Sequence, residues 1–128
     1  MLSECDYVVL TVPLAPATRG LIGPEELKRM KSDAILINVA RGGVVDELAL
    51  IAALRDGTIG GAALDVFTEE PLLAASPLWS LPNVILSPHI SGMNPHYDER
   101  AMALFAENLR RYVAGEPQLN VVEAARGY

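Results

Sequence analysis

The chain has 128 residues, which allows one domain and leaves little room for a second. Hydrophobic residues make up 51% and charged residues 20%, a composition that is typical of globular proteins and argues against disorder. The net charge of −6 argues against a nucleic-acid partner, and no apolar run approaches the roughly 20 residues of a membrane span. The single cysteine, Cys5, excludes an internal disulfide. We therefore expect an acidic, cytoplasmic protein without a membrane partner.

The first third of the chain predicts two buried strands with a short helix between them. Residues 7–12 and 34–39 are rich in Val, Ile and Leu with little alternation, which is typical of strands buried on both faces. Between them, Gly23 caps a helix that has Pro24 at its first position and acidic residues in its first turn. We expect this helix to end near Lys31, where basic residues suit the negative end of the helix dipole.

The middle of the chain predicts a second helix and a third strand. Asp46 is the expected N-cap, and Gly57 can close the helix in the left-handed conformation. The helical spacing predicts that three residues face the sheet: Leu50, Ala53 and Leu54. Residues 61–66 then form the next apolar run and predict the third buried strand.

The last part of the chain predicts a loop, a short strand and a longer helix. Three prolines favour an irregular loop over residues 68–82, before the fourth apolar run at residues 84–86. A helix is expected from near Pro95 to Ala114, and Gly115 would end it. Its apolar residues recur on one face: Met102, Phe105, Leu109, Tyr112 and Val113.

Strands that alternate with helices predict an α/β fold with a parallel sheet of about four strands and right-handed crossovers. We predict one domain over residues 1–115, followed by a tail over residues 116–128 that has no clear periodicity. The chain contains no G-x-G-x-x-G sequence. The phosphate-binding turn of a dinucleotide fold is therefore missing from it.

Polar residues follow the apolar runs at the points where ligands of parallel sheets bind, beyond the carboxyl ends of the strands. Arg41 follows the second run, and His89 follows the fourth. Asp65 ends the third run, which leads on to Glu69 and Glu70. A histidine paired with a carboxylate can act as a general acid or base, and an arginine presents a fork that fits a substrate carboxylate. This set would suit proton-coupled chemistry at a carbonyl or hydroxyl group beside a carboxylate.

Each candidate residue also has a plainer interpretation. Arg41 could equally be an exposed turn residue, and His89 a loop histidine that is hydrogen-bonded to backbone. Taken singly, Glu69 and Glu70 are more simply solvated loop charges, and His96 is more simply a surface residue. No metal site is expected, because the one cysteine and two histidines offer no recognised ligand spacing.

Four stretches of sequence carry recognisable motifs. They are VPL at residues 12–14 with TRGLI at 18–22, INVARGGVVDE at 37–47, ALDVFTEEP at 63–71 and SPHISG at 87–92. In this order, and over essentially the whole chain, they resemble the motifs of the D-isomer-specific 2-hydroxyacid dehydrogenases. The resemblance implies part of a Rossmann-like NAD-binding domain that lacks its glycine-rich first βαβ unit.

The resemblance also implies roles for individual residues. Arg41 would hold the substrate carboxylate and orient the keto group, and His89 would protonate the carbonyl oxygen during reduction. Glu70 would orient His89 and favour its charged form. The hydride would come from NAD or NADP, with NAD slightly preferred. The implied cofactor-binding residues are Val12, Pro13, Val39, Ala40, Arg41, Asp65, His89 and Gly92.

Two hypotheses about activity stay open on the sequence. In the first, the chain is a fragment of a D-2-hydroxyacid dehydrogenase that interconverts 2-hydroxy and 2-keto acids, and the isolated 128-residue chain is inactive. In the second, it is a catalytically incomplete remnant that acts only in structure or association. The bare edge of the strand at residues 7–12 favours association, and so a homo-oligomer, in either case. The tail over residues 120–128 resembles the family's return into its substrate domain.

Overall fold

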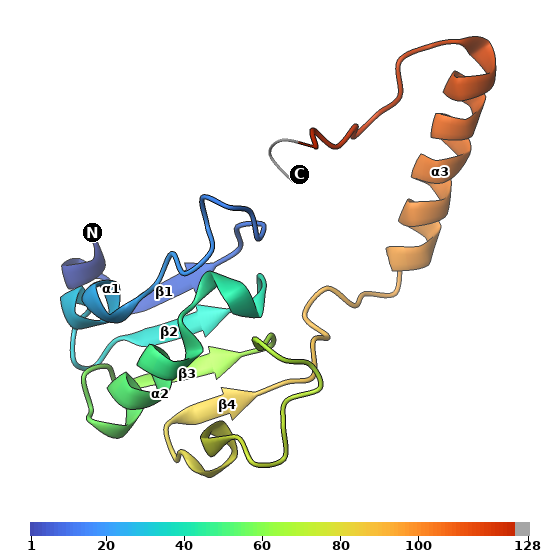
Figure 1. Ribbon diagram of the computed structural model, residues 1–128. Coiled ribbons are helices and arrows are strands. Elements are labelled where there is room, and N and C mark those ends of the chain that lie inside the picture. The colour runs from blue at the N-terminus through green and yellow to red at the C-terminus, as the bar shows by residue number, and fades with distance from the viewer. Residues whose placement is uncertain (125–128) are drawn as a thin grey trace. The chain divides into compact units, whose positions relative to one another are not determined.

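The computed structural model describes residues 1–124 and contains two compact units, Met1–Ser91 and Gly92–Tyr128. The first unit is built on a parallel sheet with the strand order β1-β2-β3-β4 (Figure 1). The four strands are β1 (Tyr7–Leu10), β2 (Ile35–Asn38), β3 (Gly61–Leu64) and β4 (Val84–Leu86). The predicted α/β class and all four predicted strands are confirmed, with ends that agree within two residues.

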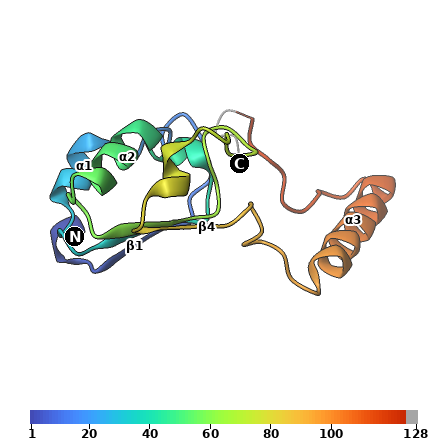
Figure 2. The same ribbon diagram turned by 90° about the horizontal axis from the view of Figure 1, so that it is seen from below.

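Two helices cover one face of this sheet (Figure 2): α1 (Pro24–Arg29) and α2 (Glu47–Arg55). Both begin at the predicted caps. The Gly23 amide donates to the Glu26 carboxylate at 3.2 Å, and the Asp46 carboxylate accepts from the Ala49 amide at 3.1 Å. Gly57 follows α2 with φ of 68°, the left-handed conformation predicted for it.

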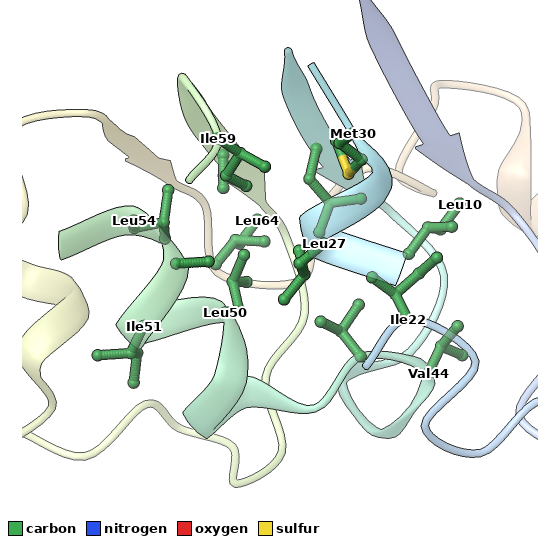
Figure 3. Close-up of a cluster of buried hydrophobic side chains, with 14 of the residues drawn as sticks. Leu10, Ile22, Leu27, Met30, Val44, Leu50, Ile51, Leu54, Ile59 and Leu64 are labelled. Atoms are coloured by element: carbon green, nitrogen blue, oxygen red, sulfur yellow. The ribbon is translucent and has the colours of Figure 1, made fainter. Parts of the chain in front are cut away.

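The hydrophobic core lies between the sheet and these helices (Figure 3). Leu36 of β2 is fully buried, and Leu27 of α1 and Leu50 of α2 are each 1% exposed. The other residues predicted to face the sheet from α2, Ala53 and Leu54, are buried as well. The register that aligns β1 to β4 therefore places one row of side chains after another under the helices.

The opposite face of the sheet is apolar and partly open. Val9, Ile37, Ala63 and Ile85 are aligned across the four strands, one residue away in register from the buried rows. Val9 is 54% exposed and Ile85 is 73% exposed, and both lie on edge strands. Because parallel sheets are normally covered on both faces, an open apolar face of this kind is unusual for such a sheet.

Three short 3₁₀ helices were not predicted from the sequence: η1 (Leu2–Glu4), η2 (Gly42–Val44) and η3 (Pro77–Ser80). The last of these lies inside the segment that was predicted to be irregular. The Ser76 hydroxyl caps η3 by accepting from the Leu78 amide at 3.3 Å, and Leu78 is buried in the core. The loop between β3 and β4 is thus anchored by an apolar side chain at its centre.

The second unit contains α3 (Tyr97–Ala114) and the segments on either side of it. Gly115 ends α3 with φ of 68°, as predicted. All five apolar residues that were expected on one face of this helix are exposed. Asn108 pairs with the backbone of Leu119 through two hydrogen bonds, of 2.7 and 3.2 Å. The predicted tail extends beyond the described residues, because residues 125–128 lie outside them. Within residues 1–124, no helix is long and apolar enough to cross a membrane.

Candidate active site

The carboxyl ends of all four strands meet at one edge of the sheet. The parallel register places Leu10, Asn38, Leu64 and Leu86 side by side, so the segments after them leave the sheet together. These segments hold every residue predicted for the site except Gly92, which is the first residue of the second unit. We therefore expect a ligand to bind at this edge of the sheet.

A buried asparagine shapes the turn after β2. The Asn38 side chain is 1% exposed; its Oδ1 accepts from the Ala40 amide and its Nδ2 donates to the Arg41 carbonyl, each at 3.1 Å. The Arg41 side chain leaves this turn as an exposed group whose Nη1 donates to the Ala40 carbonyl at 2.7 Å. Asn38 was not predicted as a site residue, although a polar residue inside an apolar strand is a signal that could have identified it.

The turn that carries Arg41 lies in backbone contact with the loop after β3. A Cβ atom added to Gly42 would lie 1.9 Å from both the carbonyl carbon and the oxygen of Phe67. A carboxylate from α2 fixes the same loop, since the Thr68 amide donates to Glu47 Oε2 at 2.9 Å. The two segments that hold Arg41 and Glu70 are thus joined without space for a further atom between them.

Glu70 and His89, which come from two different loops, form a hydrogen-bonded pair. Glu70 Oε2 lies 2.7 Å from His89 Nδ1, and Glu70 Oε1 accepts from the Phe67 amide at 2.9 Å. The His89 hydrogen bond lowers the pKa of Glu70 most, the Phe67 amide adds to this, desolvation opposes it, and the charges of His89 and Arg41 contribute further. Glu70 is therefore a carboxylate at neutral pH, and the Nε2 atom of His89 is left as the ring nitrogen that can meet a ligand.

The carboxylate of Asp65 is buried under the loop that carries His89. Asp65 is 3% exposed, and its oxygens accept from the Ser87 hydroxyl at 2.6 Å and from the Ile90 and Ser91 amides at 2.9 and 2.8 Å. Desolvation raises the pKa of Asp65, but the hydrogen bonds from Ser87, Ser91 and the Ile90 amide outweigh it, so the pKa lies well below its ordinary value. Asp65 is therefore a carboxylate at neutral pH.

A cavity of about 600 Å³ adjoins the pair of Glu70 and His89. Trp79, the single tryptophan of the chain, lies at its rim; it is 58% exposed, and its indole N–H donates to the Leu73 carbonyl at 2.9 Å. The volume falls in the range of small-molecule sites. The lining combines mostly apolar side chains with this hydrogen-bonded pair: Phe67, Glu70, Pro71, Leu72, Trp79, Leu86, Ser87, Pro88 and His89.

The remaining predicted residues lie at the same edge of the sheet or on the surface. Val12 is half-buried against the core, Pro13 and Val39 are exposed and Ala40 is buried. Glu69 is an exposed loop residue. His96 Nδ1 lies 3.3 Å from the Glu99 carboxylate at the exposed start of α3. Residues 1–124 contain no group of three or more His, Cys, Asp or Glu residues placed to hold a metal.

The chain matches one family over most of its length. The model of the D-isomer specific 2-hydroxyacid dehydrogenase NAD binding domain matches residues 1–91. A glycerate dehydrogenase of Methylorubrum extorquens is 48% identical over 126 residues, which cover 97% of this chain and 40% of that protein. A glyoxylate/hydroxypyruvate reductase B of Yersinia enterocolitica is 48% identical over 122 residues, which cover 95% of this chain and 37% of that protein.

Solved structures give the same result. A D-isomer specific 2-hydroxyacid dehydrogenase of Xanthobacter autotrophicus, in complex with NADPH and MES, matches 99% of this chain and 52% of its own, with a TM-score of 0.92 and 50% identity. An NADPH-dependent glyoxylate/hydroxypyruvate reductase of Sinorhizobium meliloti, in complex with NADP and sulfate, matches 99% of this chain and 41% of its own, with a TM-score of 0.90 and 33% identity. The chain thus spans well under two thirds of the length of these relatives.

Proposed function

This chain belongs to the D-isomer specific 2-hydroxyacid dehydrogenase family, and we propose that it supplies the acid/base half of a site that reduces a 2-keto acid to a D-2-hydroxy acid. The observation that carries the proposal is the contact between His89 and Glu70, two residues from separate loops, at the edge of the sheet where Arg41 also lies. Since the chain spans 40% or less of its curated relatives, the proposal concerns this chain together with the further parts that those relatives possess.

His89 is the proton donor in this proposal. Its Nδ1 is held by the Glu70 carboxylate at 2.7 Å, which fixes the orientation of the ring. The opposite nitrogen, Nε2, then donates a proton to the keto oxygen as that oxygen becomes a hydroxyl. Arg41 holds the substrate carboxylate, because a guanidinium presents two parallel N–H donors that match the two carboxylate oxygens.

The residues at this edge fit the nicotinamide end of NAD or NADP and not its phosphates. Val39 offers an exposed apolar side chain two residues before Arg41, which a flat ring could contact, whereas the chain has no glycine-rich turn for a pyrophosphate. The bound nicotinamide supplies the hydride. The proposed contacts along the cofactor also include Val12, Pro13, Ala40 and Gly92.

Small 2-keto acids are the first substrates to test, because the relatives named above act on glycerate, glyoxylate and hydroxypyruvate by their names. The site residues serve this chemistry only when the phosphate-binding part of the cofactor domain is present, so the isolated chain is inactive in our proposal. The reaction takes place in the cytoplasm, as expected for an acidic chain with one cysteine.

The experiment is an assay of 2-keto acid reduction in a protein of the relatives' length that contains this chain. His89→Ala should lower kcat by about 10²- to 10⁴-fold, since it removes the proton donor. Arg41→Lys should mainly raise KM, because an ammonium group cannot form the paired hydrogen bonds. His96→Ala and Arg55→Lys are the matched controls, on the exposed start of α3 and the last turn of α2. If His89→Ala and Arg41→Lys both leave reduction unchanged, the proposal is wrong.

A second candidate function is association through the edge of the sheet. β1 is an edge strand, and its Tyr7 and Val9 side chains are 67% and 54% exposed. Open edges of this kind pair with other chains, so a dimer or larger species of the isolated chain is expected. If the chain acts only by association, changes at Arg41 or His89 should leave its NADH binding unchanged. Only its mass in solution should then respond to changes in β1.

A further inference from the structure

Asp65 makes more hydrogen bonds at this edge of the sheet than a contact with a cofactor would require. We propose that Asp65 is a positioning residue, whose carboxylate holds the backbone of residues 87–91 in the one arrangement that brings His89 against Glu70. The inference rests on the proposed function for its relevance to catalysis. Its structural content, that one carboxylate sets the orientation of another residue's ring, can be tested without any turnover.

The contacts of Asp65 enclose His89 on both sides along the chain. Oδ1 accepts from the Ser87 hydroxyl at 2.6 Å and from the Ile90 amide at 2.9 Å, and Oδ2 accepts from the Ser91 amide at 2.8 Å. One donor therefore comes two residues before His89, and the other two come from the peptides that follow it. The loop is tied to β3 at both ends, with the imidazole between the ties.

The backbone of His89 needs such a tie. Its φ is 56°, in the left-handed region that only a few per cent of non-glycine residues adopt. A non-glycine residue stays in this region when the surrounding structure over-determines it. The two consecutive amides aimed at Asp65 supply that constraint, since they fix the peptides immediately after His89. The ring then meets Glu70, which the Phe67 amide holds from the other side.

A role for Asp65 purely as a cofactor ligand predicts something different. Both carboxylate oxygens already accept hydrogen bonds from the protein, and the side chain is 3% exposed. A cofactor ligand would leave the His89 ring unchanged in the absence of cofactor, whereas a positioning residue acts there at all times. The free chain can therefore distinguish the two roles.

The experiment is NMR on the full 128-residue chain, without cofactor or substrate, comparing the wild type with Asp65→Asn. Both oxygens of Asp65 accept hydrogen bonds, whereas Asn has one oxygen and one NH2 group that only donates. At least one of the hydrogen bonds to residues 87–91 is therefore lost in Asp65→Asn. We expect hydrogen exchange at the Ile90 and Ser91 amides to become about tenfold faster or more, as for a lost hydrogen bond to a charged group. We also expect the hydrogen-bonded Nδ1 proton of His89 to lose its downfield resonance.

Two controls separate positioning from general stability. Asp33→Asn changes an exposed aspartate that follows α1 and precedes β2, and it should change neither signal. Leu50→Ala weakens the core and should speed exchange generally while keeping the His89 ring proton in place. The proposal is overturned if Asp65→Asn leaves both signals as in the wild type, or if Leu50→Ala removes the ring-proton resonance to the same extent.

A second variant keeps the test decisive if Asp65→Asn does not fold. Ser87→Ala removes one of the three donors and leaves the carboxylate in place, so the loop is tied to β3 at one end only. Hydrogen exchange at the Ile90 and Ser91 amides should then be several-fold faster, and Ser80→Ala is the matched serine control. Unchanged exchange at both amides would overturn the proposal. Either result is independent of the assay of His89→Ala, so a failure here and a failure of the proposed function can be told apart.

Discussion

Gly42→Ala is the smallest change that should separate the two loops of the proposed site. The added Cβ would lie 1.9 Å from the carbonyl carbon and oxygen of Phe67 and 2.5 Å from the Thr68 nitrogen. Ordinary contacts between such atoms lie at about 3.5–4.0 Å. All three atoms belong to backbone, so no side-chain rotation relieves the overlap, and one of the two segments has to move.

The expected magnitude is at the upper end of the range for overpacking. Insertion of a single carbon into a packed interior costs about 1–3 kcal/mol, and occasionally more. Gly42 is buried and the overlap is with backbone, so we expect a loss of about 3 kcal/mol in the free energy of unfolding. The displaced loop carries Glu70, and therefore its hydrogen bond with His89 should weaken as well.

Urea unfolding followed by circular dichroism measures this loss, and Gly43→Ala is the matched control. A Cβ at Gly43 would lie 3.2 Å from a Leu14 methyl carbon and 3.4 Å from an Arg19 nitrogen, both of them ends of flexible side chains. Gly43→Ala should therefore stay within about 1 kcal/mol of the wild type. If Gly42→Ala is as stable as Gly43→Ala, the close approach of the two loops is wrong, and with it the way in which Arg41 and Glu70 are held.

Three further predictions concern the core, the sheet edge and the buried carboxylate. Leu50→Ala should lower the free energy of unfolding by about 2–5 kcal/mol, whereas Leu48→Ala, at an 80% exposed position of the same helix, should change it by less than about 0.5 kcal/mol; equal losses would contradict the assigned core. Val9→Lys should reduce self-association of the isolated chain in analytical ultracentrifugation, and an unchanged mass distribution would exclude β1 as the associating edge. The pKa of Asp65 is below its ordinary value of 3.8, so the stability that this carboxylate contributes is complete above that value and is lost as the pH falls towards the folded pKa. The free energy of unfolding, measured with urea between about pH 4 and pH 2, should therefore depend less on pH in Asp65→Asn than in the wild type. An equal pH dependence of the two proteins would contradict this.

The sequence was sufficient to predict the sheet, because each strand is a short apolar run between clear turn and cap residues. Asp46 and Gly57 marked the ends of α2, and the structure places both as predicted. The 3₁₀ helix at Gly42–Val44 was not predicted, since two adjacent glycines indicate a turn without specifying its hydrogen bonds. Similarly, Pro77–Ser80 was predicted to be part of an irregular loop. Its 3₁₀ helix is stabilised by burial of Leu78, a tertiary contact that the local sequence does not indicate.

The site was predictable as a set of residues but not as a geometry. Spacing placed His89 and Glu70 after different strands, and only the folded chain brings Nδ1 and Oε2 to 2.7 Å. The support around the pair could not be read from the sequence. Asn38 and Asp65 act through hydrogen bonds to the backbone of other segments, and the left-handed conformation of His89 has no signal in a sequence that lacks a glycine at that position.

The central claim is that the Glu70 carboxylate orients His89 for proton donation, and kcat for reduction of a 2-keto acid tests it most directly. In a protein of family length that contains this chain, Glu70→Gln leaves one oxygen for the two groups that Glu70 now contacts, the Phe67 amide and His89 Nδ1. The ring should therefore lose its fixed orientation, and kcat should fall while KM stays close to that of the wild type. Glu69→Gln, the adjacent exposed glutamate, should leave kcat unchanged. A kcat for Glu70→Gln that equals that of Glu69→Gln would contradict the pairing of Glu70 with His89.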